Sequence, residues 1–126
     1  MSDEFEQETQ ELGNAILMVY VLITRVCGLL PIPISLPFEG ADTLHGEDMI
    51  AAVIRAANLI EDEPIDELIQ AGIWGGCLHW LSAAHLFIRY MEASEYIVGQ
   101  EVRINLATSG EVLHTVAHQL MDSSEE

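Results

Sequence analysis

Residues 12–30 read LGNAILMVYVLITRVCGLL, a long apolar stretch that few polar side chains interrupt. Large apolar residues recur in and just before it at alternating spacings of four and three, the heptad pattern of a helix buried along one stripe. The repeating positions are Phe5, Leu12, Ile16, Val19, Ile23, Val26 and Leu30. Because the opposite side is also apolar, the middle of this helix must be covered on most sides. The stretch therefore predicts a core helix over about residues 3–27, in preference to a seam between two copies of the chain.

Arg25 and the flanking residues argue against a membrane span in this stretch. A span needs roughly 20 apolar residues, and a guanidinium inside the apolar layer is costly. Acidic residues flank the stretch on both sides, and Pro31 ends it. The acidic start of the chain also lacks the basic residues that begin a signal peptide. We therefore expect a cytoplasmic protein without membrane contact.

Residues 31–38, PIPISLPF, cannot continue the helix, because three prolines remove backbone donors and restrict φ. Apolar side chains alternate with period two at Ile32, Ile34, Leu36 and Phe38. The pattern predicts an extended segment that lies against the core. Residues 102–106 also alternate, so the sequence allows a minor two-stranded element between residues 32–36 and 102–106.

Four further helices are expected in the rest of the chain. The second spans about 47–60, with Asp42 or Thr43 as its cap. The third begins at Pro64, and its glycines 72, 75 and 76 either end it or allow a close helix crossing. The fourth spans about 77–98, and the fifth begins at a capping box over residues 108–111 and ends near Met121. Residues 122–126 form a frayed acidic tail, so the prediction is an all-α, single-domain bundle of about five helices over residues 1–126.

The charge balance limits the classes of partner. The chain has 21 acidic and four basic residues, for a net charge of −17. All four bases are arginines within apolar sequence, so we expect each to pair with a carboxylate and to leave an almost purely anionic exterior. Such an exterior repels phosphate backbones and anionic lipid, and it attracts basic surfaces. The arginines are Arg25, Arg55, Arg89 and Arg103.

These features favour a small acidic protein-interaction module or inhibitor, whose partner is a basic protein surface such as that of a nucleic-acid-binding protein. Glu4, Glu8 and Glu11 share a helix face at about 6 Å per turn. This is close to the spacing of phosphates along a nucleic-acid strand, so the pattern suggests a nucleic-acid mimic of the type that phages and mobile elements carry. A second cluster completes the predicted partner-binding residues: Glu61, Asp62, Glu63, Asp66 and Glu67.

The first alternative is a structural subunit that forms a helical homo-oligomer, such as a homodimer, through the first helix. The second is a metal-dependent enzyme or sensor that uses Glu111, His114 and His118, because two imidazoles one helical turn apart can chelate a transition metal. The histidine pair lacks the adjacent glutamate that serves as general base in metalloproteases. A solvated polar face explains the same residues more simply, and we expect no cofactor and no catalytic residue.

The two cysteines, Cys27 and Cys77, lie far apart within apolar sequence. Neither belongs to a spacing that is typical of metal or redox sites. They are expected to be buried thiols in a reducing compartment.

Overall fold

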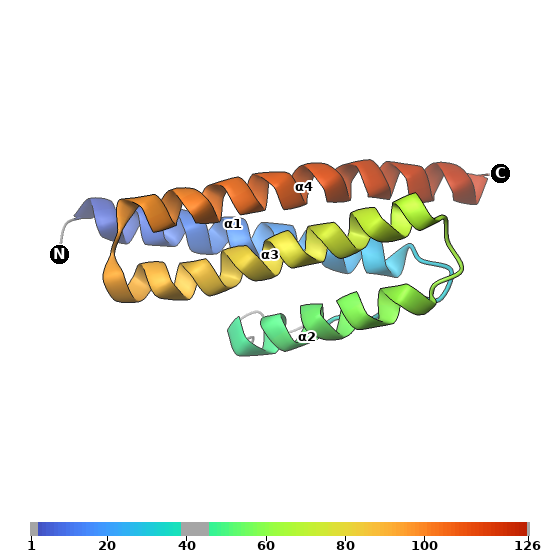
Figure 1. Cartoon of the computed structure of the whole chain (residues 1–126), viewed down its shortest axis with the longest axis horizontal. Coiled ribbons are helices and arrows are strands. Elements are labelled where there is room, and N and C mark those ends of the chain that lie inside the picture. Colours follow the sequence, from blue (N-terminus) through green and yellow to red (C-terminus); the bar gives the residue numbers. More distant parts are fainter. Residues whose placement is uncertain (1–2, 39–45, 126) are drawn as a thin grey trace.

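The computed structural model describes residues 3–38 and 46–125, with side chains as far as residue 123. Its elements are α1 (Asp3–Gly28), α2 (Gly46–Leu59), the 3₁₀ turn η2 (Ile60–Asp62), α3 (Glu67–Ala93) and α4 (Tyr96–Glu125). Three long helices, α1, α3 and α4, lie side by side with α3 antiparallel to the other two, and the shorter α2 packs on α3 (Figure 1). The predicted all-α class is confirmed, and the described residues form four α-helices where about five were expected.

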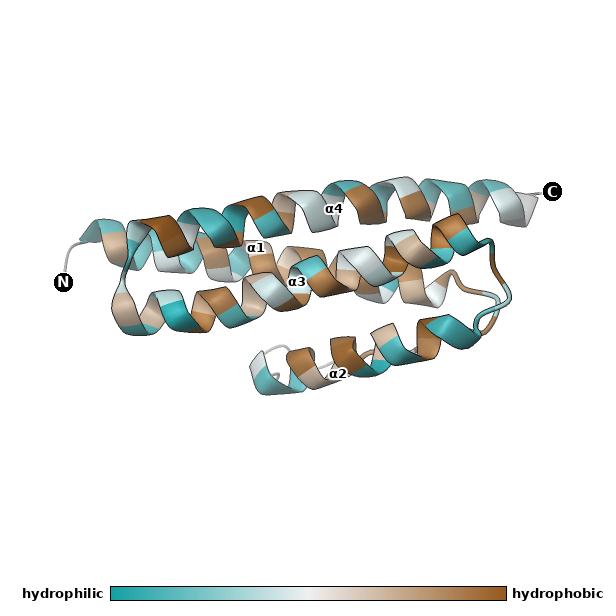
Figure 2. Cartoon of the chain, viewed as in Figure 1, coloured by the Kyte–Doolittle hydropathy of each residue, from teal (hydrophilic) through white to brown (hydrophobic). Residues whose placement is uncertain are grey.

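The apolar stripe of α1 is the centre of the core. Leu12, Ile16, Ile23, Val26 and Leu30 are all buried, whereas Val19 is partly buried. Hydrophobic residues recur along all four helices, and those that face inward form one cluster (Figure 2). The heptad positions are therefore used within the chain. By length and composition alone α1 could also cross a membrane, a property that it shares with core helices and signal sequences.

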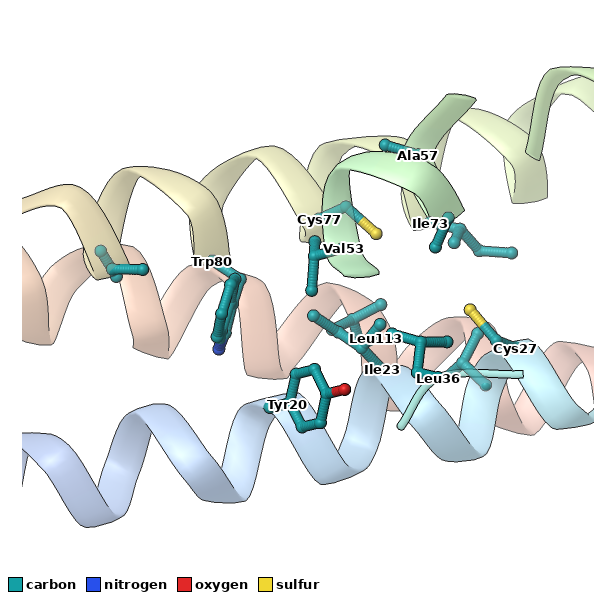
Figure 3. Close-up of a cluster of buried hydrophobic side chains, with 14 of the residues drawn as sticks. Tyr20, Ile23, Cys27, Leu36, Val53, Ala57, Ile73, Cys77, Trp80 and Leu113 are labelled. Atoms are coloured by element: carbon teal, nitrogen blue, oxygen red, sulfur yellow. The ribbon is translucent and has the colours of Figure 1, made fainter. Parts of the chain in front are cut away.

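An aromatic pair joins α1 to α3. The rings of Tyr20 and Trp80 lie 5.8 Å apart between centroids, and both side chains are buried. Trp80 Nε1 donates a hydrogen bond of 2.9 Å to the carbonyl of Ile16, which satisfies the indole N–H without water. Figure 3 shows Leu113 of α4 and Val53 of α2 in the same cluster. All four helices thus contribute to one core.

The extended segment after α1 packs against the core through Ile34 and Leu36, whereas Ile32 and Phe38, at the ends of the predicted alternation, are exposed. Its backbone is bound by other elements rather than by a strand. The Ile34 amide donates to the carbonyl of Cys27 at 3.1 Å, the Tyr20 hydroxyl donates to the carbonyl of Pro37 at 2.6 Å, and Arg55 of α2 donates to the carbonyl of Ser35. The segment therefore fixes how α2 returns onto the bundle.

The predicted pairing of residues 32–36 with 102–106 is wrong. Residues 102–106 lie within α4, where Val102 and Leu106 are buried one turn apart and Ile104 is exposed. Alternation over five residues satisfied the period of a strand, but the longer apolar repeat follows the helical period. The prolines of the segment remove the amides that a ladder would need.

Two predicted helix boundaries are also wrong, because α3 and α4 are each continuous. The glycines at 72, 75 and 76 do not end α3, and the predicted capping box at 108–111 lies inside α4. Gly72 and Gly76 instead allow the close helix crossing, since a Cβ added there would lie 2.8 Å from Val116 or 2.7 Å from Leu113 of α4. Buried Ser109 donates from its hydroxyl to the carbonyl of Gly76 at 2.7 Å. The turn between the helices is made at Ser94, which has a left-handed φ of 57°.

The remaining helix ends differ in detail from the expectation. The cap of α3 is Asp66, whose carboxylate accepts from the Leu68 amide at 2.8 Å, so the helix begins after Pro64. The C-terminal helix passes its expected end near Met121 and continues to Glu125, so residues 122–125 are helical. The caps expected for the second helix, Asp42 and Thr43, lie outside the described residues.

Gly76→Ala should lower the free energy of unfolding by about 1–3 kcal/mol, as overpacking of a core does. The added Cβ would lie 2.7 Å from Cγ of Leu113, whose side chain is fully buried, so the neighbouring side chains would have to shift. Gly75→Ala is the matched control, since its Cβ meets no atom within 4 Å. It should leave stability unchanged or raise it by up to about 1 kcal/mol. Chemical denaturation followed by circular dichroism measures both; equal effects would contradict the close crossing.

Tyr20→Phe should lower the free energy of unfolding by about 1 kcal/mol, because the Pro37 carbonyl loses its donor. Tyr96→Phe is the control, since the Tyr96 side chain is 70% exposed. Thermal and chemical denaturation measure the difference. A Tyr20→Phe variant as stable as the control would show that this hydrogen bond does not hold the extended segment.

Candidate protein-interaction surface

Carboxylates dominate the surface. Among the acidic residues whose side chains the structure describes, all except Glu8 and Glu63 are exposed. Within the same part of the chain, the ion pairs are those of Arg103 with Glu8 at 3.6 Å and with Glu11 at 3.4 Å. Most of the described carboxylates therefore have no cationic side chain beside them, and their charge acts on the surrounding solvent.

The prediction that every arginine would pair with a carboxylate is wrong for the described side chains. Arg103 does so, but Arg55 donates to the Ser35 carbonyl and Arg25 lies 3.9 Å from the sulfur of Met121. Arg89 is exposed and forms none of the described ion pairs.

Glu8 and Glu11 connect α1 to its neighbours. Both carboxylates lie beside Arg103 of α4, and the less exposed of the two, Glu8, also forms a hydrogen bond with Tyr90 of α3. Burial raises the pKa of Tyr90, and Glu8 raises it further through its hydrogen bond and charge, while Arg103 lowers it. Of the three glutamates predicted to imitate phosphates, Glu4 is exposed and outside this network.

The fold brings a second set of acids beside the start of α1. The turn between α3 and α4 lies next to the first turns of α1 (Figure 1), and the rings of Phe5 and Tyr90 are 5.4 Å apart between centroids. Glu92 lies in the last turn of α3 and Glu95 precedes α4, and both are exposed. We call the resulting group the acidic end; its members are Asp3, Glu4, Glu6, Glu92 and Glu95.

Sequence reasoning did not place Glu92 and Glu95 in the site. They lie about ninety residues from Asp3 along the chain, so their proximity depends on how α3 and α4 turn. The available signal was the run of acids between two helices, which marks a connection but does not say what lies beside it.

The other predicted cluster lies at the opposite end of the bundle, between α2 and α3 (Figure 1). Glu61, Asp62 and Glu67 are exposed there, and Asp66 is exposed but caps α3. Glu63 is only 8% exposed, and its carboxylate accepts from the Ile32 amide at 3.0 Å. The Glu63 and Asp66 carboxylates thus bind backbone amides within the fold, whereas Glu61, Asp62 and Glu67 remain exposed to solvent.

Glu111, His114 and His118 lie exposed on the outer side of α4. Among the described residues, no group of three or more histidine, cysteine or acidic side chains could hold a metal ion. The hydroxyl of Thr115, between the two histidines, donates to the carbonyl of Glu111 at 3.1 Å. The described geometry thus provides a polar helix face, and the third ligand expected from Glu111 does not join the imidazoles.

Both cysteines are buried thiols. Burial raises the pKa of Cys27 to about 12, with Glu63 raising it further and Arg55 lowering it. Burial also raises the pKa of Cys77 to about 12. The thiolate is the form that attacks electrophiles or binds metals, so neither side chain is suited to such chemistry near neutral pH.

Comparisons with known proteins leave the surface as the only guide to function. No protein-family model, no curated protein and no solved structure matches the chain. The described features that bear on function are the exposed carboxylates and the apolar side chains that remain at the surface.

The free energy of unfolding should fall as pH rises above about 9. The ordinary pKa of a cysteine thiol is 9.0, and burial raises the pKa of both folded thiols to about 12. Between these values the folded chain holds more protons than the unfolded chain, so rising pH favours unfolding. Denaturation under reducing conditions at several pH values measures the slope. Cys77→Ala should make the dependence of the unfolding free energy on pH shallower. An unchanged slope in this variant would show that the buried Cys77 thiol does not cause it.

Proposed function

We propose that the protein is a small acidic interaction module that binds a basic surface on another protein and blocks that surface. The observation that carries the proposal is that all described carboxylates except Glu8 and Glu63 are exposed, and that among the described side chains only Arg103 forms ion pairs with any of them. A net charge of −17 attracts cationic surfaces over a distance of about one Debye length, roughly 8–10 Å in physiological salt. Such attraction speeds association and excludes anionic partners.

The acidic end is the contact site in this proposal. Its five carboxylates take no part in the described ion pairs or side-chain hydrogen bonds, whereas the opposite cluster uses Glu63 and Asp66 within the fold. The two ends are separated by the length of α3, whose 27 residues span about 40 Å. This distribution of charge therefore favours a partner that contacts one end of the bundle. It fits less well with a partner whose groove would bind a continuous row of carboxylates.

The basic partner is expected to be a protein that itself binds anions, such as a nucleic-acid-binding protein. A surface that evolved to hold phosphates offers clustered arginine and lysine side chains, which carboxylates can occupy. In this form the module acts as an inhibitor by competing for the same cations. Direct binding to nucleic acid or to anionic membranes is opposed by the like charge.

A homo-oligomer is the second candidate, because the outer side of α1 carries exposed apolar residues. Met18 is 73% exposed and Val21, about one turn later, is 40% exposed, and exposed Leu29 follows directly after the helix. Salt distinguishes the two functions. Screening weakens attraction to a basic partner but relieves repulsion between two copies of charge −17, so self-association would strengthen with salt.

The test requires a binding partner, which can be captured on the immobilised protein and then purified. The acidic end is neutralised by combining D3N, E4Q, E6Q, E92Q and E95Q. This variant should bind the purified partner at least about tenfold more weakly, because several charges opposite to those of the partner are lost. The affinity of the unaltered chain should also fall at least about tenfold between about 50 and 500 mM salt. Calorimetry or surface plasmon resonance measures both quantities.

The matched control changes the net charge equally through E61Q, D62N, E67Q, E101Q and E111Q, all at exposed positions. It should retain affinity within about threefold, since it lowers only the long-range attraction. Equal losses in both variants would contradict the assignment to the acidic end. An affinity that does not change with salt would contradict the electrostatic function itself.

A further inference from the structure

An apolar groove lies beside the acidic end, between α1, α3 and the start of α2. Its volume is about 290 Å³. The groove lies where α2 begins at Gly46, and its lining comes from α1, α2 and α3. The main lining residues are Gly13, Met49, Ile50, Phe87, Ile88 and Met91.

The walls of the groove have the chemistry of an apolar binding site. Ile88 is 41% exposed and Met91 is 45% exposed, so burying them would gain free energy in proportion to the area covered. Two methionines, one from α2 and one from α3, provide flexible and polarizable side chains that adapt to different apolar partners. On α1 the wall is formed by Gly13 and Ile16, and a Cβ added at Gly13 would make an ordinary van der Waals contact with the Phe87 ring at 3.6 Å.

The charges around the groove select the kind of occupant. Glu6 lies seven residues before Gly13, on the same side of α1, and Glu92 directly follows Met91 on α3. Glu47 and Asp48 also precede Met49 on α2, and Arg89 follows Ile88 on α3, so carboxylates outnumber cations beside the described lining residues. A second copy of this chain or an anionic lipid surface would bring further negative charge to this position, whereas a cationic segment would be attracted. Charge complementarity therefore points to a basic partner.

We propose that this groove receives an amphipathic, basic helix of the partner protein, an inference that rests on the proposed function. Apolar residues of the helix, at spacings of three and four, would cover Phe87, Ile88 and Met91. Lysine or arginine residues on the same helix would meet the carboxylates of the acidic end. Helices that lay an apolar face in a groove and use charge for orientation are a common mode of recognition.

The test uses three synthetic peptides of about 18 residues, or five helical turns. The first has leucines at helical spacing and lysines elsewhere; the second has the same composition in an order without an apolar face. The third has glutamates in place of the lysines. Calorimetry with the full-length chain should show the first binding at least about tenfold more tightly than either of the others.

A matched pair of variants localises the site. I88Q/M91Q should remove most of the preference for the amphipathic lysine peptide, while M18Q/I104Q should keep it. Both variants replace one isoleucine and one methionine that are at least partly exposed, and the control positions do not line the groove. Circular dichroism checks that each variant folds. In the unaltered chain, intermolecular nuclear Overhauser effects should connect the peptide to the methyl groups of Met49, Ile88 and Met91.

The outcomes separate the two proposals. If both lysine peptides bind equally and salt weakens both, the groove is not a helix site, and the acidic function stands. If neither lysine peptide binds, the acidic function fails together with this inference. Equal binding of the glutamate and lysine peptides would overturn the basic partner. If I88Q/M91Q unfolds and no methyl contacts appear in the unaltered chain, the groove serves folding alone, and the inference is wrong.

Discussion

The burial of α1 against α3 and α4 is the constraint on which the other features depend. Each large apolar side chain of the stripe, such as Leu12 or Ile23, contributes about 1.5–3 kcal/mol when it leaves water. The hydrogen bond from Trp80 to the Ile16 carbonyl and the ring contact with Tyr20 fix the register between α1 and α3. Once this register is set, the turn after α3 must lie beside the first turns of α1, and the acidic end is assembled.

The same packing explains how a chain with so few cations remains compact. Negative charges repel one another, so their cost is smallest where they lie far apart or near the positive ends of helix dipoles. Asp3, Glu4 and Glu6 lie in the first turn of α1, and Asp66 caps α3. Arg103 is placed where α1 and α4 meet and joins them through Glu8 and Glu11. The other described carboxylates are mostly exposed to solvent. They form none of the described ion pairs within the fold, and their charge favours a cationic partner.

Local sequence patterns predicted the structure correctly where a single hydrophobic period was clear. The heptad of α1 predicted a core helix, and the prolines of residues 31–38 predicted an extended segment with inward-facing apolar residues. They failed where a residue has two uses. Gly76 can end a helix or permit close packing, and Ser109 can cap a helix or donate to a neighbouring backbone. In both cases the outcome depends on a residue of the other helix: Gly76 packs against Leu113, and Ser109 donates to the Gly76 carbonyl.

The sequence by itself determined the helical class, the central position of α1 and the excess of carboxylates, because periodicity and composition act locally or over the whole chain. Only the tertiary structure decided that Glu92 and Glu95 join Asp3, that Glu63 is held within the fold, and that an apolar groove lies beside the acidic end. Side chains that are distant along the chain meet only after the helices have packed. Such meetings depend on the angle and register of that packing, which no single segment encodes.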